Sequence, residues 1–180
     1  RGKIRQNGNR AYRGGAHNMH KDSVRVTHRA PQTPTFTSIN VGARLVMNEE
    51  HHFQTFNVGS VWFDMIYVKG GTFMMGCTQE MDSDAYAHES PMHEVTLSDY
   101  YIGQIEVTQA LWKNVMGNSN NPSTHKGNDL PVHNVSWDDC QLFIEKLNLM
   151  TGLNFRMPTE AEWEYAARGG VKSRGYKYAG

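Results

Sequence analysis

The sequence predicts an α+β fold that is rich in loops. Short segments such as His93 to Ser98 alternate apolar and polar residues, as half-buried strands do. Ser136 and Thr159 are good helix N-caps, and apolar residues at helical spacing follow each of them. With 38% hydrophobic residues, 11% aromatic residues and 17 glycines, the composition suits short elements joined by loops better than a helical bundle.

Length, charge and hydropathy bound the class of protein. A chain of 180 residues is long enough for one ordinary domain. The 18 Lys and Arg residues balance the 18 Asp and Glu residues, so we expect neither nucleic acid nor a membrane surface as partner. The best apolar run, Val61 to Val68, is too short to span a bilayer and contains Asp64. The chain starts at Arg1 without a signal segment, as expected of a processed product or a fragment.

Residues 1 to 30 are basic, and two interpretations of them are open. A nucleic-acid-binding arm would need aromatic side chains for stacking, and Tyr12 is the only one. The alternative is the arginine-rich last segment of a folded domain. Residues 47 to 60 then look like a connector. His51 and His52 within it make a poor metal chelate, because neighbouring residues of an extended segment point to opposite sides.

The strands are expected in the middle of the chain. Met65 to Val68 and Thr72 to Gly76 are strand candidates, and Lys69-Gly70-Gly71 between them suggests a tight hairpin turn. His93 to Ser98 follows as a half-buried strand, and Tyr100 to Val107 is expected to extend the sheet.

Three capped helices are expected in the second half. Thr108 can cap a short helix that ends at Gly117. A loop rich in Asn, Gly and Pro follows from 118 to 131. Ser136, with Asp139 in the capping-box position, begins the next helix, which closes near Gly152.

The third helix begins within the nonapeptide Arg156 to Glu164, which reads R-M-P-T-E-A-E-W-E. Thr159 and Glu162 form a capping box, and the helix dipole favours the negative charge of the first turn. We therefore expect these glutamates to cap the helix rather than to act as acids or bases.

The nonapeptide resembles the R-[LM]-P-T-E-A-E-W-E signature of the formylglycine-generating enzyme (sulfatase-modifying factor) family. Residues 65 to 180 resemble the N-terminal part of that family's domain, in both order and spacing of motifs. The other matching motifs are V-x-G-G-x-F-x-M-G at Val68 to Gly76, P-x-H-x-V at Pro91 to Val95, I-G-x-x-E-V-T-x-x-x-W at Ile102 to Trp112, N-P-S at Asn121 to Ser123 and L-P-V-x-x-V-S-W at Leu130 to Trp137. The resemblance implies an irregular α+β fold, similar to that of C-type lectins.

The order of the pieces departs from the family pattern. Residues 10 to 46 resemble the family's C-terminal end, with Arg13-Gly14-Gly15 and Asn40 to Val46 in place of R-G-G-S-W and N-[LI]-G-F-R-[LV]. The family's central G-N-V-W-E-W segment is absent, so we expect an incomplete fold. We expect residues 1–48 to end one family domain, 49–64 to be a linker and 65–180 to begin a second domain. The alternative is that the two pieces pack as one permuted pseudo-domain.

The resemblance also indicates which chemistry to look for. The family's best-known activity oxidises a sulfatase cysteine to formylglycine, with copper held by two cysteines just after R-G-G-S, and thiolates suit Cu(I). Here that segment is Ala16 to Ser23, which contains no cysteine, and Met19 stands about where the first would be. His17, Met19 and His20 could form a copper triad, but a coincidence within a loop explains them more simply.

We therefore predict no catalytic residue, no metal site and no cofactor in this chain, although complete family members use copper and calcium. By motif, the resemblance assigns substrate contact to Asn40, although a polar residue near a strand start also has a structural explanation. Cys77 and Cys140 match no motif cysteine; they fit a disulfide or, more simply, two buried free thiols.

Two functional hypotheses follow. In the first, the chain is part of a formylglycine-generating enzyme-like protein and is inactive as given. In the second, it is a non-catalytic, lectin-like binding module. Expected partners are a sulfatase-like polypeptide, another protein or a glycan, with no nucleic acid and no membrane span. The compartment stays open, and an extracytoplasmic one is compatible with the sequence.

Overall fold

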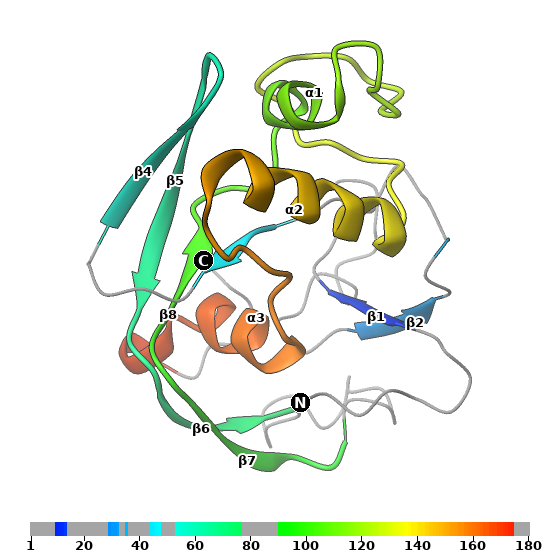
Figure 1. Ribbon diagram of the computed structural model, residues 1–180. Coiled ribbons are helices and arrows are strands. Elements are labelled where there is room, and N and C mark those ends of the chain that lie inside the picture. The colour runs from blue at the N-terminus through cyan, green and yellow to red at the C-terminus, as the bar shows by residue number, and fades with distance from the viewer. Residues whose placement is uncertain are drawn as a thin grey trace. The chain divides into compact units, whose positions relative to one another are not determined.

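The computed structural model of the chain describes residues 10–13, 29–32, 35, 44–47, 53–76 and 90–174 (Figure 1). The chain divides into two compact units. The first comprises Arg1–Gln32, Lys69–Asp99 and Thr159–Gly180, and the second comprises Thr33–Val68 and Tyr100–Pro158. The described residues contain three α-helices, a short 3-10 helix and three antiparallel sheets, which confirms the predicted α+β class.

The second unit is built on a four-stranded antiparallel sheet in the order β3-β8-β5-β4. Its strands are β3 (Val46–Met47), β4 (Phe53–Val58), β5 (Val61–Val68) and β8 (Tyr100–Gly103). Every residue of β8 is buried, as expected for a strand with a neighbour on each side. Strand β8 ends at Gly103, so it is shorter than the expected segment from Tyr100 to Val107.

Two helices belong to this unit: the first packs beside the hairpin of β4 and β5, and the second packs against the first (Figure 1). They are α1 (Gln109–Met116) and α2 (Trp137–Thr151), and their predicted caps, Thr108 and Ser136, are confirmed. Trp112 of α1 stacks on Phe143 of α2, with ring centroids 5.0 Å apart and planes 5° from parallel. No described helix has the length and apolarity needed to cross a membrane.

The hairpin of β4 and β5 includes residues 53 to 60, so this part of the expected connector has regular secondary structure. Val58 and Val61 are partners, which leaves Gly59 and Ser60 as a two-residue turn. Gly59 has φ +60°, a conformation in which glycine is favoured. On the facing strands Phe56 packs on Phe63, with ring centroids 5.5 Å apart. The turn and this aromatic pair explain why the segment forms strands.

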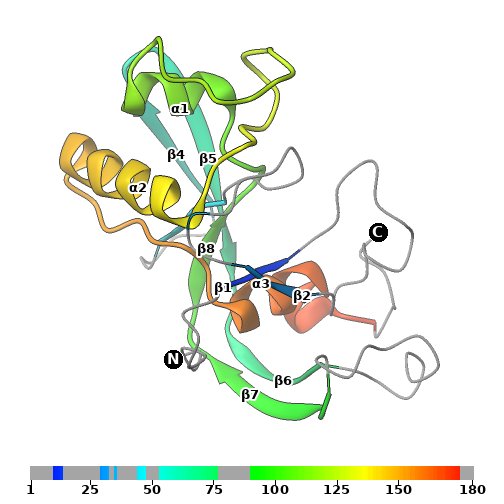
Figure 2. The same cartoon turned by 90° about the vertical axis from the view of Figure 1, so that its right-hand side faces the viewer.

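The first unit packs α3 (Glu160–Ala167) against a second pair of strands. Strand β6 (Gly71–Met75) pairs with β7 (His93–Leu97), and Phe73 of β6 contacts Tyr165 of α3 with ring centroids 5.1 Å apart. Helix α3 leads into the 3-10 helix η4 (Gly170–Lys172). Strands β1 (Arg10–Arg13) and β2 (Arg29–Gln32) pair with each other, and β1 lies beside α3 (Figure 2).

The expected hairpin across Lys69-Gly70-Gly71 is wrong, because β5 and β6 belong to different sheets. A Cβ added to Gly70 would lie 2.3 Å from the carbonyl oxygen of Leu97, so glycine is needed for close approach to another backbone segment. Asp99 binds both residues that connect β5 to β6. Its carboxylate accepts from the Gly70 N–H at 2.9 Å and from Lys69 Nζ at 2.8 Å.

Residues 44–47, from the piece that resembles the family's C-terminal end, lie in the core of the second unit. Leu45, Val46 and Met47 are at most 3% exposed. Val46 exchanges two backbone hydrogen bonds with Arg156, both 2.9 Å long, and β3 pairs with β8. The division of the chain into domains stays a prediction, but this short segment shares a core with the piece that follows it.

Candidate functional site

Most residues that the sequence assigned to candidate chemistry lie outside the described part of the chain. They are Asn40, the Ala16 to Ser23 segment with His17, Met19 and His20, the pair His51 and His52, and Cys77. Their roles stay predictions. Within the described ranges, no group of three His, Cys, Asp or Glu side chains is arranged to hold a metal ion.

Cys140 is described, and its surroundings make it a poor metal ligand. It lies in α2, is 2% exposed and forms no disulfide. Burial, reinforced by the negative charge of Asp139, raises the pKa of its thiol from 9.0 to about 12. Metals bind the thiolate, which this environment disfavours. Because the chain has two cysteines in all, Cys77 and Cys140, a copper centre with two thiolate donors would have to include the buried Cys140.

Two glutamates of the nonapeptide, Glu162 and Glu164, make structural contacts, and Glu162 completes the predicted capping box. Glu162 accepts from the Thr159 N–H, and its own N–H donates to Thr159 Oγ1. Glu164 is fully buried and accepts from the backbone N–H of Gly76 at 2.9 Å. Its carboxylate pairs with Arg168 at 2.8 Å, and Arg168 donates in turn to the Gly76 carbonyl at 2.7 Å. This buried ion pair holds both backbone groups of Gly76, so Glu164 is an anchor of the first unit.

A fully buried glutamine, Gln109, organises the long loop after α1. It is the first residue of α1 and is 0% exposed. Its Nε2 donates to the carbonyls of His125 (2.8 Å) and Pro131 (3.2 Å). Its Oε1 accepts from Asn121 Nδ2 (2.9 Å) and from the Gly127 N–H (3.2 Å). One side chain thus makes four hydrogen bonds to residues 12 to 22 positions away.

The N-P-S motif adds hydrogen bonds within the same loop. Asn121 Oδ1 accepts from the N–H of Ser123, and Ser123 Oγ bonds both backbone groups of His133. The Thr124 N–H donates to His133 Nε2 at 3.0 Å. These bonds fix an otherwise irregular loop, because its polar groups find partners within the protein.

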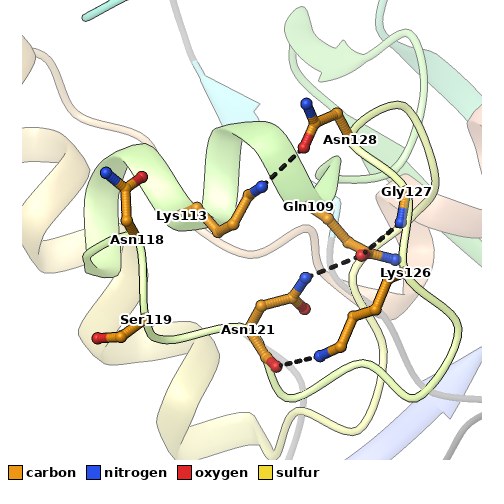
Figure 3. Close-up of a pocket in the computed structure, with 8 residues that line it drawn as sticks. All are labelled: Gln109, Lys113, Asn118, Ser119, Asn121, Lys126, Gly127 and Asn128. Carbon is orange, nitrogen blue, oxygen red and sulfur yellow. Dashed lines mark hydrogen bonds between the residues drawn. The ribbon is translucent and has the colours of Figure 1, made fainter.

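A polar pocket of about 470 Å³ lies between α1 and the loop that follows it. Figure 3 shows Lys113 on α1 and Lys126 on the following loop among the residues that line it. Lys113 Nζ donates to Asn128 Oδ1 and Lys126 Nζ to the Asn121 carbonyl, both at 2.7 Å. The remaining lining residues are all polar or glycine, without a carboxylate: Gln109, Asn118, Ser119, Asn121, Gly127 and Asn128. The pocket is therefore rich in hydrogen-bond donors and positively charged.

Sequence reasoning missed this pocket, and two signals could have pointed to it. A glutamine directly after an N-cap is an unusual residue to bury, and a loop rich in Asn, Gly and Pro follows it. The two lysines are 13 positions apart by their numbers, however, so only the fold brings them to one pocket.

Known proteins similar in sequence to this chain indicate its family. The family described as sulfatase-modifying factor enzyme 1-like domain matches residues 58–180. Chaperone protein LppX of Paenibacillus barcinonensis is 36% identical, covering 65% of this chain and 49% of that protein. The formylglycine-generating enzyme of Bos taurus is 30% identical, covering 73% of this chain and 34% of that enzyme. The inactive C-alpha-formylglycine-generating enzyme 2 of the same organism is 32% identical, covering 41% and 22%.

The fold agrees with these matches. Treponema denticola variable protein 1 superposes with a TM-score of 0.60 at 30% identity, covering 73% of this chain and 60% of that chain. The chain spans about half the length, or less, of the three curated relatives. The expected α+β fold of the family is therefore confirmed.

Proposed function

Because the chain belongs to the sulfatase-modifying factor enzyme 1-like domain family, we propose that it is a formylglycine-generating enzyme-like polypeptide that binds another polypeptide without oxidising it. Family membership alone leaves the activity open, because the relatives include an enzyme named as active and one named as inactive. The distinction has to come from residues of this chain.

The burial of Cys140 carries the non-catalytic half of the proposal. A copper centre built on two thiolates would have to use both cysteines of the chain, Cys77 and Cys140. Cys140 packs in the core of the second unit with its thiol kept protonated, so recruiting it would require opening that core. The residues present therefore do not fit a copper centre with two thiolate ligands.

The binding half rests on the relatives. The family is described as sulfatase-modifying, the family resemblance implies a cysteine within a sulfatase polypeptide as substrate, and another relative is named a chaperone protein. Both roles require a surface that receives a polypeptide. A chain that keeps the family fold but not its thiolates would retain such a surface and lose the oxidation.

The test uses residues 1–180 with a fluorescent peptide that carries a sulfatase-type target cysteine. Binding is measured by fluorescence anisotropy, and aldehyde formation by mass spectrometry with a carbonyl-reactive probe, in the presence of Cu(I) and oxygen. We expect binding without aldehyde, and no change with the Cys140→Ala variant. A peptide in which serine replaces the cysteine is the matched control and should bind equally well. Aldehyde production by the wild type would overturn the non-catalytic half, and failure to bind either peptide would overturn the binding half.

A further inference from the structure

The pocket beside α1 holds two ammonium groups without a compensating carboxylate. An ammonium has three N–H donors, and Lys113 and Lys126 each use one of them on a neutral oxygen. Neither lysine forms an ion pair with a residue in the described part of the chain. Asp129 lies in the same loop but does not line the pocket. Two lysines facing one pocket leave free donors and an unbalanced positive charge.

Hydrogen bonds within the protein hold the backbone around the two lysines in place without a ligand. Gln109 satisfies all its hydrogen-bonding capacity within the protein, and Asn121 and Gly127 are held by it. The backbone that carries Lys126 is therefore fixed on both sides, and Lys113 stands on a helix. Binding an anion here would need little ordering of the backbone, which favours affinity.

We propose that this pocket binds carboxylates in an acidic segment of the partner polypeptide; the inference rests on the polypeptide-binding role proposed above. The negative charge of such a segment complements Lys113 and Lys126. The hydroxyl of Ser119 and the amide of Asn118 line the same pocket and can bond peptide groups. Pockets for free small molecules are mostly apolar, whereas this one has no apolar side chain in its lining, so a polar chain is the better occupant.

The experiment titrates the full chain with labelled tetraglutamate and with labelled tetraglutamine, a peptide of the same length without charge. The pocket variant is Lys113→Gln/Lys126→Gln. The matched control is Lys146→Gln/Lys172→Gln, which makes the same two changes outside the pocket, on α2 and on η4. Thermal melts of each variant establish that the fold is kept. A tetrasaccharide of uronic acid serves as a second anionic probe.

We expect the wild type to prefer tetraglutamate and to lose that preference at high salt. The pocket variant should bind tetraglutamate about tenfold more weakly, since each partly exposed ion pair contributes modestly. The control should bind like the wild type. If both peptides bind equally and the pocket variant makes no difference, the pocket inference falls while polypeptide binding stands. Lysine-dependent binding of the tetrasaccharide without binding of tetraglutamate would overturn the assignment to a polypeptide. If neither peptide binds but the sulfatase-type peptide does, the proposed function stands and this inference falls.

Discussion

Replacing Gln109 by leucine tests whether one buried side chain supports the pocket. Leucine is apolar and close in size, so the change removes hydrogen bonds with little change in packing. Four groups lose their partner: the carbonyls of His125 and Pro131, the Asn121 amide and the Gly127 N–H. These groups face inward onto a side chain that is 0% exposed.

The magnitude follows from how far water can replace the lost partners. A buried polar group left without a partner costs about 1–3 kcal/mol. Asn121 and Gly127 are half-buried and His125 and Pro131 are exposed residues, so water reaches part of the loop once it moves. We therefore expect Gln109→Leu to lower the free energy of unfolding by about 2–4 kcal/mol, less than four full penalties. That is a large share of the stability of an ordinary domain.

Urea unfolding followed by tryptophan fluorescence measures the change, because Trp112 is 1% exposed and lies on the same helix. The control is Gln141→Leu on α2, the same substitution at a half-buried glutamine with no hydrogen bond of its side chain to the described residues. It should alter stability by less than about 0.5 kcal/mol. Equal effects of the two substitutions would refute the role of Gln109 as organiser of the loop.

Two further predictions concern buried groups. Glu164→Gln should lower the free energy of unfolding by about 3–5 kcal/mol, because it leaves Arg168 buried without its counter-charge. In the same unfolding assay, the double variant with Arg168→Leu should lose less free energy of unfolding than the two single variants lose together. Additive losses would contradict the pairing. Folding raises the pKa of the Cys140 thiol from 9.0 to about 12, so its contribution is complete below pH 9 and is lost as pH rises toward 12. Relative to Cys140→Ala, the wild type should therefore lose about 1.4 kcal/mol between neutral pH and about pH 10, and a constant difference would contradict this.

The helices could be predicted because their signals are local. Thr108, Ser136 and Thr159 each cap their own helix with a side chain one turn away, so neighbouring residues decide the structure. Gly152 ends α2 for an equally local reason, its φ of +70°. Such contacts form wherever the rest of the chain lies.

The strand partners could not be predicted, because partner choice depends on distant segments. Gly70 and Gly71 look like a turn, but Gly70 is required by the approach of Leu97, which is 27 positions later by its number. Gly59 and Ser60 form the real turn, flanked by Val58 and Val61. Both pairs fit hairpin rules, and only packing separates them.

The same difference between local and distant signals applies to the candidate site. The spacing of Glu162 to Thr159 predicts its capping role correctly. The role of Glu164 could not be predicted, because its partners are Gly76, far away in sequence, and Arg168, one turn later. Gln109 carries no local signature either, since its four bonds go to a loop that has no regular structure.

The placement of β3 bears on how the two resembling pieces relate. Leu45 to Met47 would be an exposed apolar segment if the first piece stood alone, yet they are buried against β8 and Arg156 of the second. Arg44 adds an ion pair with Glu106, at 3.0 Å. Apolar residues such as Leu45 and Val46 suit a strand, but two residues show no periodicity that could indicate β8 as the partner. Each of the two units also combines residues from both pieces. The described residues therefore show one core to which both pieces contribute, while the division of the chain into domains stays a prediction.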